Sequence, residues 1–367
     1  MNNNTQQNSG IELLRVFSII LLILYHTSII GNASEYPSVI DKFLKLIHMG
    51  WVGTDFFLTI AGYFSAFHFI SREQKPKLSS YYIQRLTRIF PSYYIFLAVH
   101  FTIVLFIINS LGKPMQYTSE ITPWLLSFSI NHFFATGKLS GVALEALFSI
   151  AILVQLYVVY SWMFSIIKRT NIIIFILAIS WIVAIILRFQ MQTNGYWYIY
   201  FSTFTRMDPF ILGSLLALIL HQTNFGELLN KYSGYIFIVS LSFFLLIIMI
   251  TRGFWVEHAL TIPVAFPFIA IFCAATLNFI ISNPINGPVI NQIASLGKYT
   301  FAIYLFKIPV VYILYKVMNN YLILPSEILA KLMLVIFSIP LCFLIGAIWY
   351  WLIENPINEI TIKKRHL

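Results

Sequence analysis

Long, uninterrupted runs of apolar residues recur along the chain and determine which elements the sequence predicts. Each run is about 20 residues long, the length that a helix needs to cross the roughly 30 Å hydrocarbon core of a bilayer. The runs lack the alternation of apolar and polar residues that is typical of membrane β-strands. We therefore predict ten membrane-spanning helices, at about residues 12–31, 51–70, 90–111, 141–167, 171–189, 205–221, 233–251, 259–281, 296–318 and 328–352.

The composition excludes a soluble globular domain. Of the 367 residues, 59% are hydrophobic and only 10% are charged, and the mean hydropathy is +0.82. A soluble domain carries roughly 25% charged residues, so most of this surface must face hydrocarbon instead of water. The expected fold class is an all-α integral membrane protein embedded in a lipid bilayer.

The net charge of +10 would suggest a nucleic-acid partner in a soluble protein. Here many of the basic residues lie in three stretches beside the apolar runs. This distribution indicates membrane topology, so the positive charge does not predict a nucleic-acid partner. These residues are Arg72, Lys75, Lys77, Arg85 and Arg88, then Lys168 and Arg169, then Lys363, Lys364 and Arg365. Because cytoplasmic connections collect Lys and Arg, we predict that these stretches and both termini are cytoplasmic.

One membrane domain is expected, over residues 12–353. A disordered, low-complexity cytoplasmic tail precedes it at 1–11, and a short basic cytoplasmic tail follows at 354–367. The longest connection, 112–140, falls outside the cell in this topology. Its middle, 124–135, is apolar but too short to span the membrane, which predicts a re-entrant or interfacial helix.

A few ionisable side chains lie inside or at the ends of the predicted spans. They are informative because a charge in a bilayer costs about 2.5–3.5 kcal/mol on insertion scales. In the predicted topology, the outer set is His26, Asp55, Glu145, Arg206 and Asp208, and the inner set is Arg15, Arg85, Arg88 and Lys298. Cys273 and Cys342 lie in apolar runs and are expected to be packing residues, and no Cys/His spacing predicts a metal site.

Arg15 and His26 share the first predicted span and point in the same direction. They are eleven residues apart, which at 3.6 residues per turn is close to three full turns. Their separation along the helix axis is roughly 16 Å, about half the hydrocarbon thickness. One helix face would thus connect an inner cation with an outer imidazole, which suits a ligand that enters from the cytoplasm with anionic groups.

Six short segments form an ordered set along nearly the whole chain. The first pairs Arg15 with His26. The others are Gly53–Phe57 with Ala61–Tyr63, Arg85–Pro91, Glu145 with Phe148, Arg206 and Asp208 with Gly213, and Trp351–Pro356. In this order and on these spans they resemble the acyltransferase family 3 membrane proteins, which O-acylate cell-surface sugars. One position departs from the family pattern, because Lys307 stands two residues before Pro309 where family members often have His.

The resemblance implies transfer of an acyl group, most often acetyl, from cytoplasmic acyl-CoA to a hydroxyl of an extracytoplasmic polysaccharide or lipid-linked glycan. The location would be the cytoplasmic membrane of a bacterial cell. Acyl-CoA would be a co-substrate, with no permanently bound cofactor and no metal.

The polar residues suit this chemistry. A sugar hydroxyl is a poor nucleophile at neutral pH and needs a base that titrates near neutrality, so we assign His26 as general base. Glu145 is the first candidate, and Asp55 the second, to orient the other ring nitrogen. Arginine binds phosphates bidentately, and two arginines at i and i+3 share a helix face. We therefore expect Arg85 and Arg88 to bind the CoA phosphates, with Arg15 nearer the thioester arm.

Structural roles remain open for several of these residues. Glu145 could instead form a salt bridge with Arg206. Alternatively, Arg206 and Asp208 could pair with each other and fix the sixth span, or they could belong to the acceptor site. Arg85 and Arg88 could serve topology alone.

The roles of two further residues and of the whole chain also have alternatives. Glu354, at the inner end, is expected to be structural or to contact the acceptor, and the role of the mid-membrane Lys307 is open. A transporter of a glycan or anionic molecule would also have a basic vestibule and polar midplane residues, although the chain shows no internal repeat. The acceptor, the acyl group, an acyl-enzyme intermediate and homo-oligomerisation are not determined by the sequence.

Overall fold

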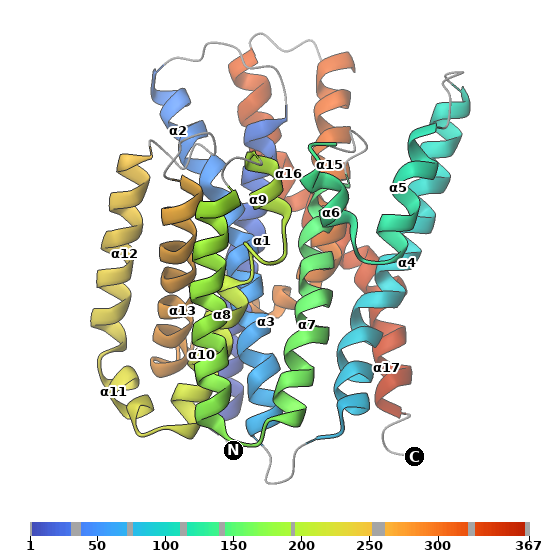
Figure 1. Ribbon diagram of the computed structural model, residues 1–367. Helices are drawn as coiled ribbons and strands as arrows, with labels where there is room; N and C mark the ends of the chain where they lie inside the picture. The colour runs from blue at the N-terminus through green and yellow to red at the C-terminus, as the bar shows by residue number, and fades with distance from the viewer. Residues whose placement is uncertain are drawn as a thin grey trace.

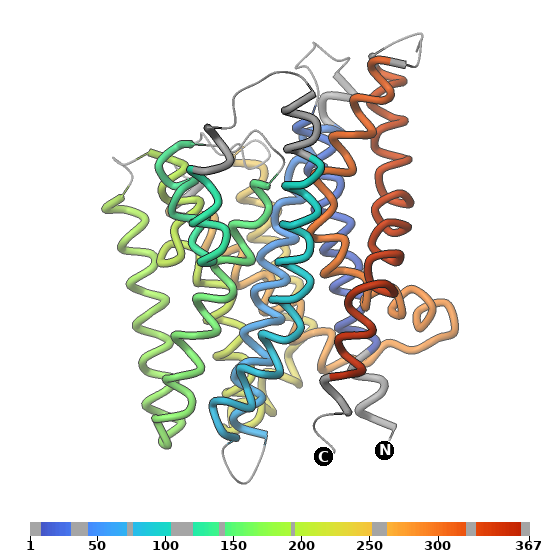
Figure 2. The backbone as a smooth tube through the Cα atoms, turned by 90° about the vertical axis from the view of Figure 1, so that its right-hand side faces the viewer, coloured from blue at the N-terminus to red at the C-terminus, as the bar shows by residue number. Residues whose placement is uncertain are grey.

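The computed structural model describes residues 2–30, 38–71, 76–110, 116–138, 144–191, 195–251, 261–321 and 327–363. These residues form helices and short connections, as the predicted fold class requires. The long helices run roughly side by side in one bundle (Figure 1). Helix α1 (Asn2–Ile29) begins and helix α17 (Asn355–Lys363) ends at the same end of this bundle (Figures 1 and 2).

The other elements follow one another along the chain with short connections. In the first half they are α2 (Ser38–His48), η1 (Met49–Val52), α3 (Gly53–Ile70), α4 (Leu78–Ser110), α5 (Gln116–Leu126), α6 (Ile130–Ala135), η2 (Glu145–Leu147), α7 (Phe148–Ile166) and α8 (Thr170–Gln190). In the second half they are α9 (Tyr196–Phe201), α10 (Asp208–Gln222), α11 (Phe225–Lys231), α12 (Ser233–Ile250), η4 (Thr261–Ala265), α13 (Phe266–Ser282), α14 (Pro288–Ser295), η5 (Leu296–Tyr299), α15 (Thr300–Tyr321), α16 (Glu327–Trp349) and η6 (Tyr350–Glu354).

The apolar runs of the sequence coincide with the long helices. In the described part of the chain, seven helical segments are long and apolar enough to cross a membrane, and α10 is a shorter apolar helix. The predicted spans at 171–189, 205–221 and 233–251 match α8, α10 and α12 to within three residues at either end. The count of ten spans and the side of the membrane on which the termini lie stay predictions.

Two helices extend beyond the predicted spans. Helix α1 begins at Asn2, so the structure continues the helix through residues 2–11, where the sequence predicts a disordered tail. Helix α4 begins at Leu78, twelve residues before the predicted span, so the segment that carries Arg85 and Arg88 is helical.

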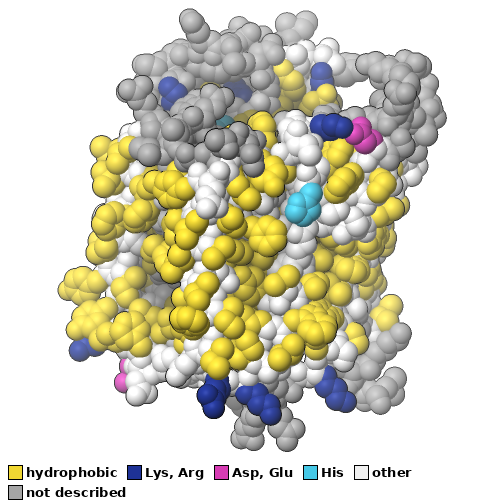
Figure 3. Space-filling view, viewed as in Figure 1, with side chains coloured by type: hydrophobic (Ala, Val, Ile, Leu, Met, Phe, Trp, Pro, Cys, Tyr) yellow, Lys and Arg dark blue, Asp and Glu magenta, His cyan; other side chains and the backbone are white. Residues whose placement is uncertain are grey.

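The outer surface carries the band of apolar side chains that a bilayer requires. On the face that it draws, Figure 3 shows this band, with Lys and Arg side chains along its lower rim and others near its upper end. The lower rim is the end at which α1 begins and α17 ends (Figure 1). The Lys and Arg side chains of the lower rim lie at the end that the sequence predicts to be cytoplasmic.

Helices α3 and α10 form the tightest contact in the bundle, and two glycines make it possible. A Cβ atom built on Gly62 would lie 2.0 Å from the carbonyl oxygen of Phe210, and one on Gly213 would lie 2.0 Å from that of Thr59. Ser214 Oγ also donates a hydrogen bond of 3.0 Å to the carbonyl oxygen of Gly62. Small residues at such crossings let two helix backbones approach within a membrane. The two glycines of the sequence motifs therefore set the spacing of α3 and α10.

The predicted re-entrant segment consists of two short helices, α5 and α6, that pack on each other. Between them Phe128 has φ +53°, a left-handed conformation that costs a non-glycine residue energy. Gln155 of α7 holds this turn, because its Nε2 donates to the carbonyl oxygen of Phe128 at 2.8 Å. Tyr93 and Tyr94 of α4 donate at 3.0 Å and 2.9 Å to the last carbonyl groups of α5. Helices α4 and α7 thus fix the hairpin beside them.

Candidate active site

A cavity of about 140 Å³ lies between helices α1, α3, α4, α7 and α15. Its lining is mostly apolar, with three arginines and a few hydroxyl groups. The lining residues are Arg15, Thr54, Phe57, Leu58, Ile60, Ala61, Phe64, Arg85, Arg88, Ile89, Ser149, Ile150, Leu153, Tyr157, Thr300, Phe301 and Tyr304. The structure thus brings together the three arginines for which the sequence predicts a common ligand.

Aromatic rings and a backbone oxygen position two of these arginines. The guanidinium carbon of Arg15 lies 5.8 Å from the centroid of the Phe64 ring, and Arg85 Nη2 donates to the carbonyl oxygen of Phe64 at 3.0 Å. The Arg85 guanidinium carbon also lies 5.7 Å and 5.6 Å from the rings of Tyr81 and Tyr157. Such cation–π contacts hold a guanidinium group without neutralising its charge.

The arginine end of the cavity carries an excess of positive charge. Arg15 has one acidic neighbour, because its Nη1 lies 2.5 Å from Glu12 Oε1. Among the described residues that line the cavity, none is acidic. The Nε atom of Arg85 is buried and has no hydrogen-bond partner in the described part of the chain. These guanidinium groups are therefore available to an anionic ligand.

His26 is buried in α1, with only 7% of its surface exposed, and it does not belong to the cavity lining. Its Nδ1 atom has no hydrogen-bond partner among the described residues. The ring of Tyr25 lies 5.0 Å from its own, and the fully buried Lys307 of α15 is close enough to act on it electrostatically. His26 thus faces protein and not lipid, as a reactive imidazole requires.

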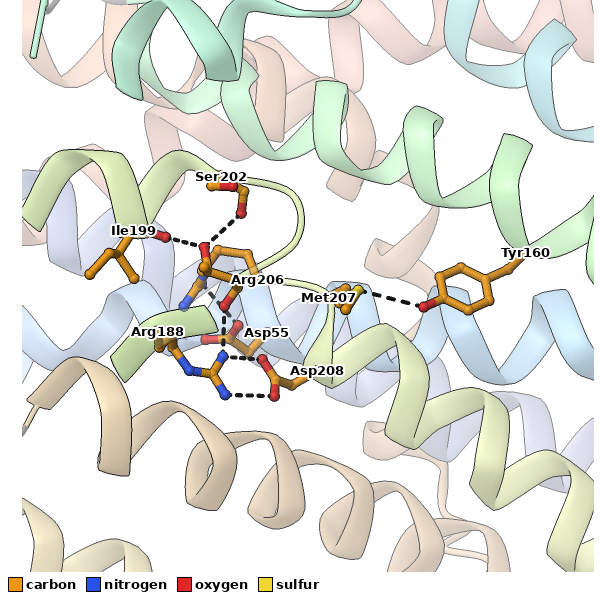
Figure 4. Close-up of polar contacts among 9 residues, drawn as sticks. Asp55, Tyr160, Arg188, Ile199, Ser202, Arg206, Met207 and Asp208 are labelled. Atoms are coloured by element: carbon orange, nitrogen blue, oxygen red, sulfur yellow. Dashed lines mark hydrogen bonds and ion pairs between the residues drawn. The ribbon is translucent and has the colours of Figure 1, made fainter. Parts of the chain in front are cut away.

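Two buried ion pairs connect α3 and α8 with α10 and the connection before it (Figure 4). Arg206 Nη2 lies 2.9 Å from Asp55 Oδ1, and both side chains are 2% exposed. Asp208, the first residue of α10, forms a bidentate pair with Arg188 of α8, with 2.8 Å between Nη2 and Oδ1. Arg188 Nη1 also donates at 2.7 Å to the carbonyl oxygen of Thr205.

These pairs correct one structural alternative from the sequence. Arg206 and Asp208 do not bind each other but take partners from different helices. Arg206 lies in the connection before α10 and pairs with α3, whereas Asp208 begins α10 and pairs with α8. Asp55, the second candidate to orient His26, binds Arg206 through Oδ1, while its Oδ2 has no hydrogen-bond partner among the described residues. Glu145 as the first candidate and Asp55 as the second therefore both stay predictions.

The two remaining glutamates lie at different places. Glu145 is half-buried in η2, immediately before α7. Glu354 is buried in η6, and its Oε1 accepts a hydrogen bond of 3.2 Å from Ser92 of α4. Ser92 in turn accepts one of 2.7 Å from Trp349 Nε1. Glu354 thus connects η6 with α4, and it lies near Arg88.

Sequence reasoning missed Arg188 and the hydroxyl groups of the cavity. Arg188 lies inside a predicted span, where the cost of a charge was a signal that it has a buried partner. Serine, threonine and tyrosine in an apolar run give no such signal. Among the described residues no cluster of three metal-ligating side chains occurs, and both cysteines are free and buried.

Two curated relatives match part of the chain. O-acetyltransferase OatA from Staphylococcus aureus strain NCTC 8325 is 28% identical over 228 residues, which cover 57% of this chain and 34% of that protein. The putative O-acetyltransferase SACOL0978 from strain COL of the same species is 26% identical over 259 residues, which cover 65% of this chain and 40% of that protein. The matches therefore span less than half of the relatives' own lengths. No solved structure matches the chain.

The family comparison covers far more of the chain than these relatives do. The family model described as an acyltransferase domain matches residues 8–347. This range includes the cavity, His26 and both buried ion pairs. The chain therefore belongs to acyltransferase family 3.

Proposed function

We propose that this protein is a membrane O-acyltransferase that moves an acyl group, acetyl in the simplest case, from acyl-CoA to a hydroxyl of a glycan. The donor would enter from the cytoplasm, and the acceptor would be a polysaccharide or lipid-linked glycan outside the cytoplasmic membrane of a bacterium. Family membership and the two O-acetyltransferase relatives support the reaction class.

The observation that carries the proposal is the convergence of Arg15, Arg85 and Arg88 on one end of a mostly apolar cavity. Coenzyme A has phosphates at one end and a long, narrow pantetheine arm that ends in the thioester. Its phosphates would bind the arginines by charge-assisted hydrogen bonds, and the arm would lie between the apolar side chains. A positive cavity mouth on the basic side of the bundle also attracts an anionic donor from the cytoplasm.

In the proposed reaction His26 takes the proton of the acceptor hydroxyl as its oxygen attacks the thioester carbon. The carbon–sulfur bond then breaks, and the departing thiolate receives that proton, which leaves an ester and free coenzyme A. The Nδ1 atom of His26, which no described residue occupies, can take up a proton or bind an orienting carboxylate. His26 lies eleven residues nearer the outer end of α1 than Arg15, on the side from which the acceptor would come.

The test uses the purified protein in nanodiscs with acetyl-CoA labelled in the acetyl group. We expect wild-type protein to transfer label to a glycan acceptor or to water. His26→Ala should lower turnover by at least about 100-fold and leave the folded yield unchanged. His132→Ala, which removes an exposed histidine on α6, is the matched control and should keep full turnover. If wild-type protein consumes no acetyl-CoA, the acyltransferase proposal is wrong and transport of a glycan or anion becomes the better hypothesis.

A further inference from the structure

The cavity is a slot with two chemically different ends. Phe64, which contacts two of the arginines, and Thr54 both line it from α3, and they are ten residues apart. Tyr157, beside Arg85, and Ser149 line it from α7, and they are eight residues apart. A helix rises 1.5 Å per residue, so the separations of ten residues on α3 and eight residues on α7 place the two ends of the slot about 12–15 Å apart. A ligand held by the arginines therefore reaches the other end only if it is long and narrow.

Three buried hydroxyl groups form that other end, and we call Thr54, Ser149 and Tyr304 the hydroxyl cluster. Their exposed fractions are 4%, 5% and 7%. Ser149 Oγ and Tyr304 Oη are hydrogen-bonded, and Thr54 is a second partner of Tyr304. Ser149 Oγ also lies 3.0 Å from the carbonyl oxygen of Ala146.

The hydroxyl cluster can present a hydrogen-bond donor to a ligand. A hydroxyl proton rotates, so Ser149 can donate either to Ala146 or to Tyr304. When Ser149 donates to Tyr304, the phenolic proton of Tyr304 is free to point into the slot. Each hydrogen bond in such a chain polarises the next, which strengthens the last donor.

The buried amino group of Lys307 lies against the ring of Tyr304. Lys307 Nζ is 3.3 Å from the ring centroid and donates to the carbonyl oxygen of Tyr304 at 2.9 Å. The Lys307 side chain is fully buried, in surroundings of low dielectric where a charge acts strongly on its neighbours. When this amino group is protonated, its charge at the ring face withdraws electron density from the phenol and makes the O–H a stronger donor to an anion.

We propose that Tyr304 donates a hydrogen bond to the thioester carbonyl oxygen of acyl-CoA and stabilises the negative charge that this oxygen gains during transfer. The inference rests on the proposed function and adds a catalytic residue to it. The bond from the acceptor oxygen to the thioester carbon pushes the carbonyl π pair onto the oxygen facing Tyr304. That pair re-forms the carbonyl group as the carbon–sulfur bond breaks, and the thiolate receives the proton that left the acceptor. Ser149 positions the Tyr304 hydroxyl, and Lys307 polarises it.

Steady-state kinetics in nanodiscs test the catalytic part. Tyr304→Phe removes one hydroxyl and keeps the ring that Lys307 contacts. Loss of one such donor should lower kcat by about 100- to 1,000-fold, with little change in KM for acetyl-CoA because the arginines remain. Tyr312→Phe, on the same helix with the side chain 46% exposed, is the matched control and should keep kcat. The proposal is overturned if Tyr304→Phe lowers kcat by less than about tenfold, or if its main effect is to raise KM for acetyl-CoA.

Infrared difference spectroscopy tests the hydrogen bond itself without turnover. The probe is acetyl-CoA with ¹³C at the thioester carbonyl, bound to the protein carrying His26→Ala. A hydrogen bond from Tyr304 lowers the carbonyl stretching frequency relative to free acetyl-CoA, and Tyr304→Phe should remove that shift. A bound carbonyl at the solution frequency, or a shift that survives Tyr304→Phe, overturns the role of Tyr304 and leaves the proposed function intact. Absence of acetyl-CoA binding overturns both.

Discussion

The buried pair of Arg206 and Asp55 allows a quantitative prediction about stability. Two arginines and two aspartates, Arg188 and Asp208 being the others, form a cluster whose formal charges cancel. Asp55→Asn leaves one uncompensated positive charge among side chains that are at most 2% exposed. Removal of one partner of a buried pair costs about 3–5 kcal/mol, so we expect Asp55→Asn and Arg206→Met each to lower the free energy of unfolding by this amount.

The double variant, Asp55→Asn with Arg206→Met, should be less destabilised than the sum of the two single changes. It restores the balance of charge, because Arg188 and Asp208 still neutralise each other. Because the double variant buries no uncompensated charge, it avoids most of the cost of each single change, so the coupling free energy should reach several kcal/mol. Arg206 also lies over the ring of Phe266, with 4.4 Å from its guanidinium carbon to the centroid, and Met can occupy that space.

Equilibrium unfolding in mixed detergent micelles, followed by tryptophan fluorescence, measures all four proteins of this cycle. The exposed pair of Lys138 and Glu120, whose side chains are 59% and 48% exposed, provides a matched control cycle. Its coupling should be at most about 1 kcal/mol, because solvent screens an exposed pair. Additive effects of the Asp55 and Arg206 changes, or a cost of Asp55→Asn below about 1 kcal/mol, would refute the reasoning.

Two further predictions concern backbone packing and the buried ammonium. Gly62→Ala places a methyl group 2.0 Å from the carbonyl oxygen of Phe210 and should destabilise the protein by about 1–3 kcal/mol, whereas Gly234→Ala, which meets only a ring atom at 3.9 Å, should be tolerated; equal unfolding midpoints would contradict this. Lys307→Met replaces an ionisable amino group at a fully buried site and should stabilise the protein by about 0.5–2 kcal/mol. It should also lower turnover, because Tyr304 loses its polarising neighbour. Unfolding and acetyl-transfer assays on the same preparation check both effects, and unchanged turnover would remove Lys307 from the mechanism.

The sequence predicted the helices because a membrane span depends on length and apolarity, which are local properties. The resemblance to the family predicted one anionic ligand for Arg15, Arg85 and Arg88, because arginine binds phosphates strongly. The structure places all three at one cavity, on two different helices.

Partner choice was not predictable from the sequence, because it depends on helix packing. Arg206 takes a partner that is 151 residues away, and Arg188 takes one that is 20 residues away. The close contact of Gly62 with α10 places Asp55 beside the connection that carries Arg206. Local sequence patterns cannot predict such a contact between distant helices. The hydroxyl cluster was not predicted for a related reason. Tyr304 and Ser149 are single hydroxyl residues in separate apolar runs, and only the packing of α7 against α15 brings them together.

The comparison of coenzyme A with pantetheine tests the central claim most directly, because pantetheine has the arm and the thiol but lacks the phosphates. Titration calorimetry in nanodiscs should show that the wild-type protein binds coenzyme A at least about 100-fold more tightly than pantetheine, since charged hydrogen bonds to phosphate contribute about 1.5–3 kcal/mol each. Arg85→Gln with Arg88→Gln should abolish this preference, whereas Lys168→Gln with Arg169→Gln, an exposed basic pair between α7 and α8, should keep it. Equal affinities in the wild-type protein, or a preference that survives the loss of Arg85 and Arg88, would contradict the account.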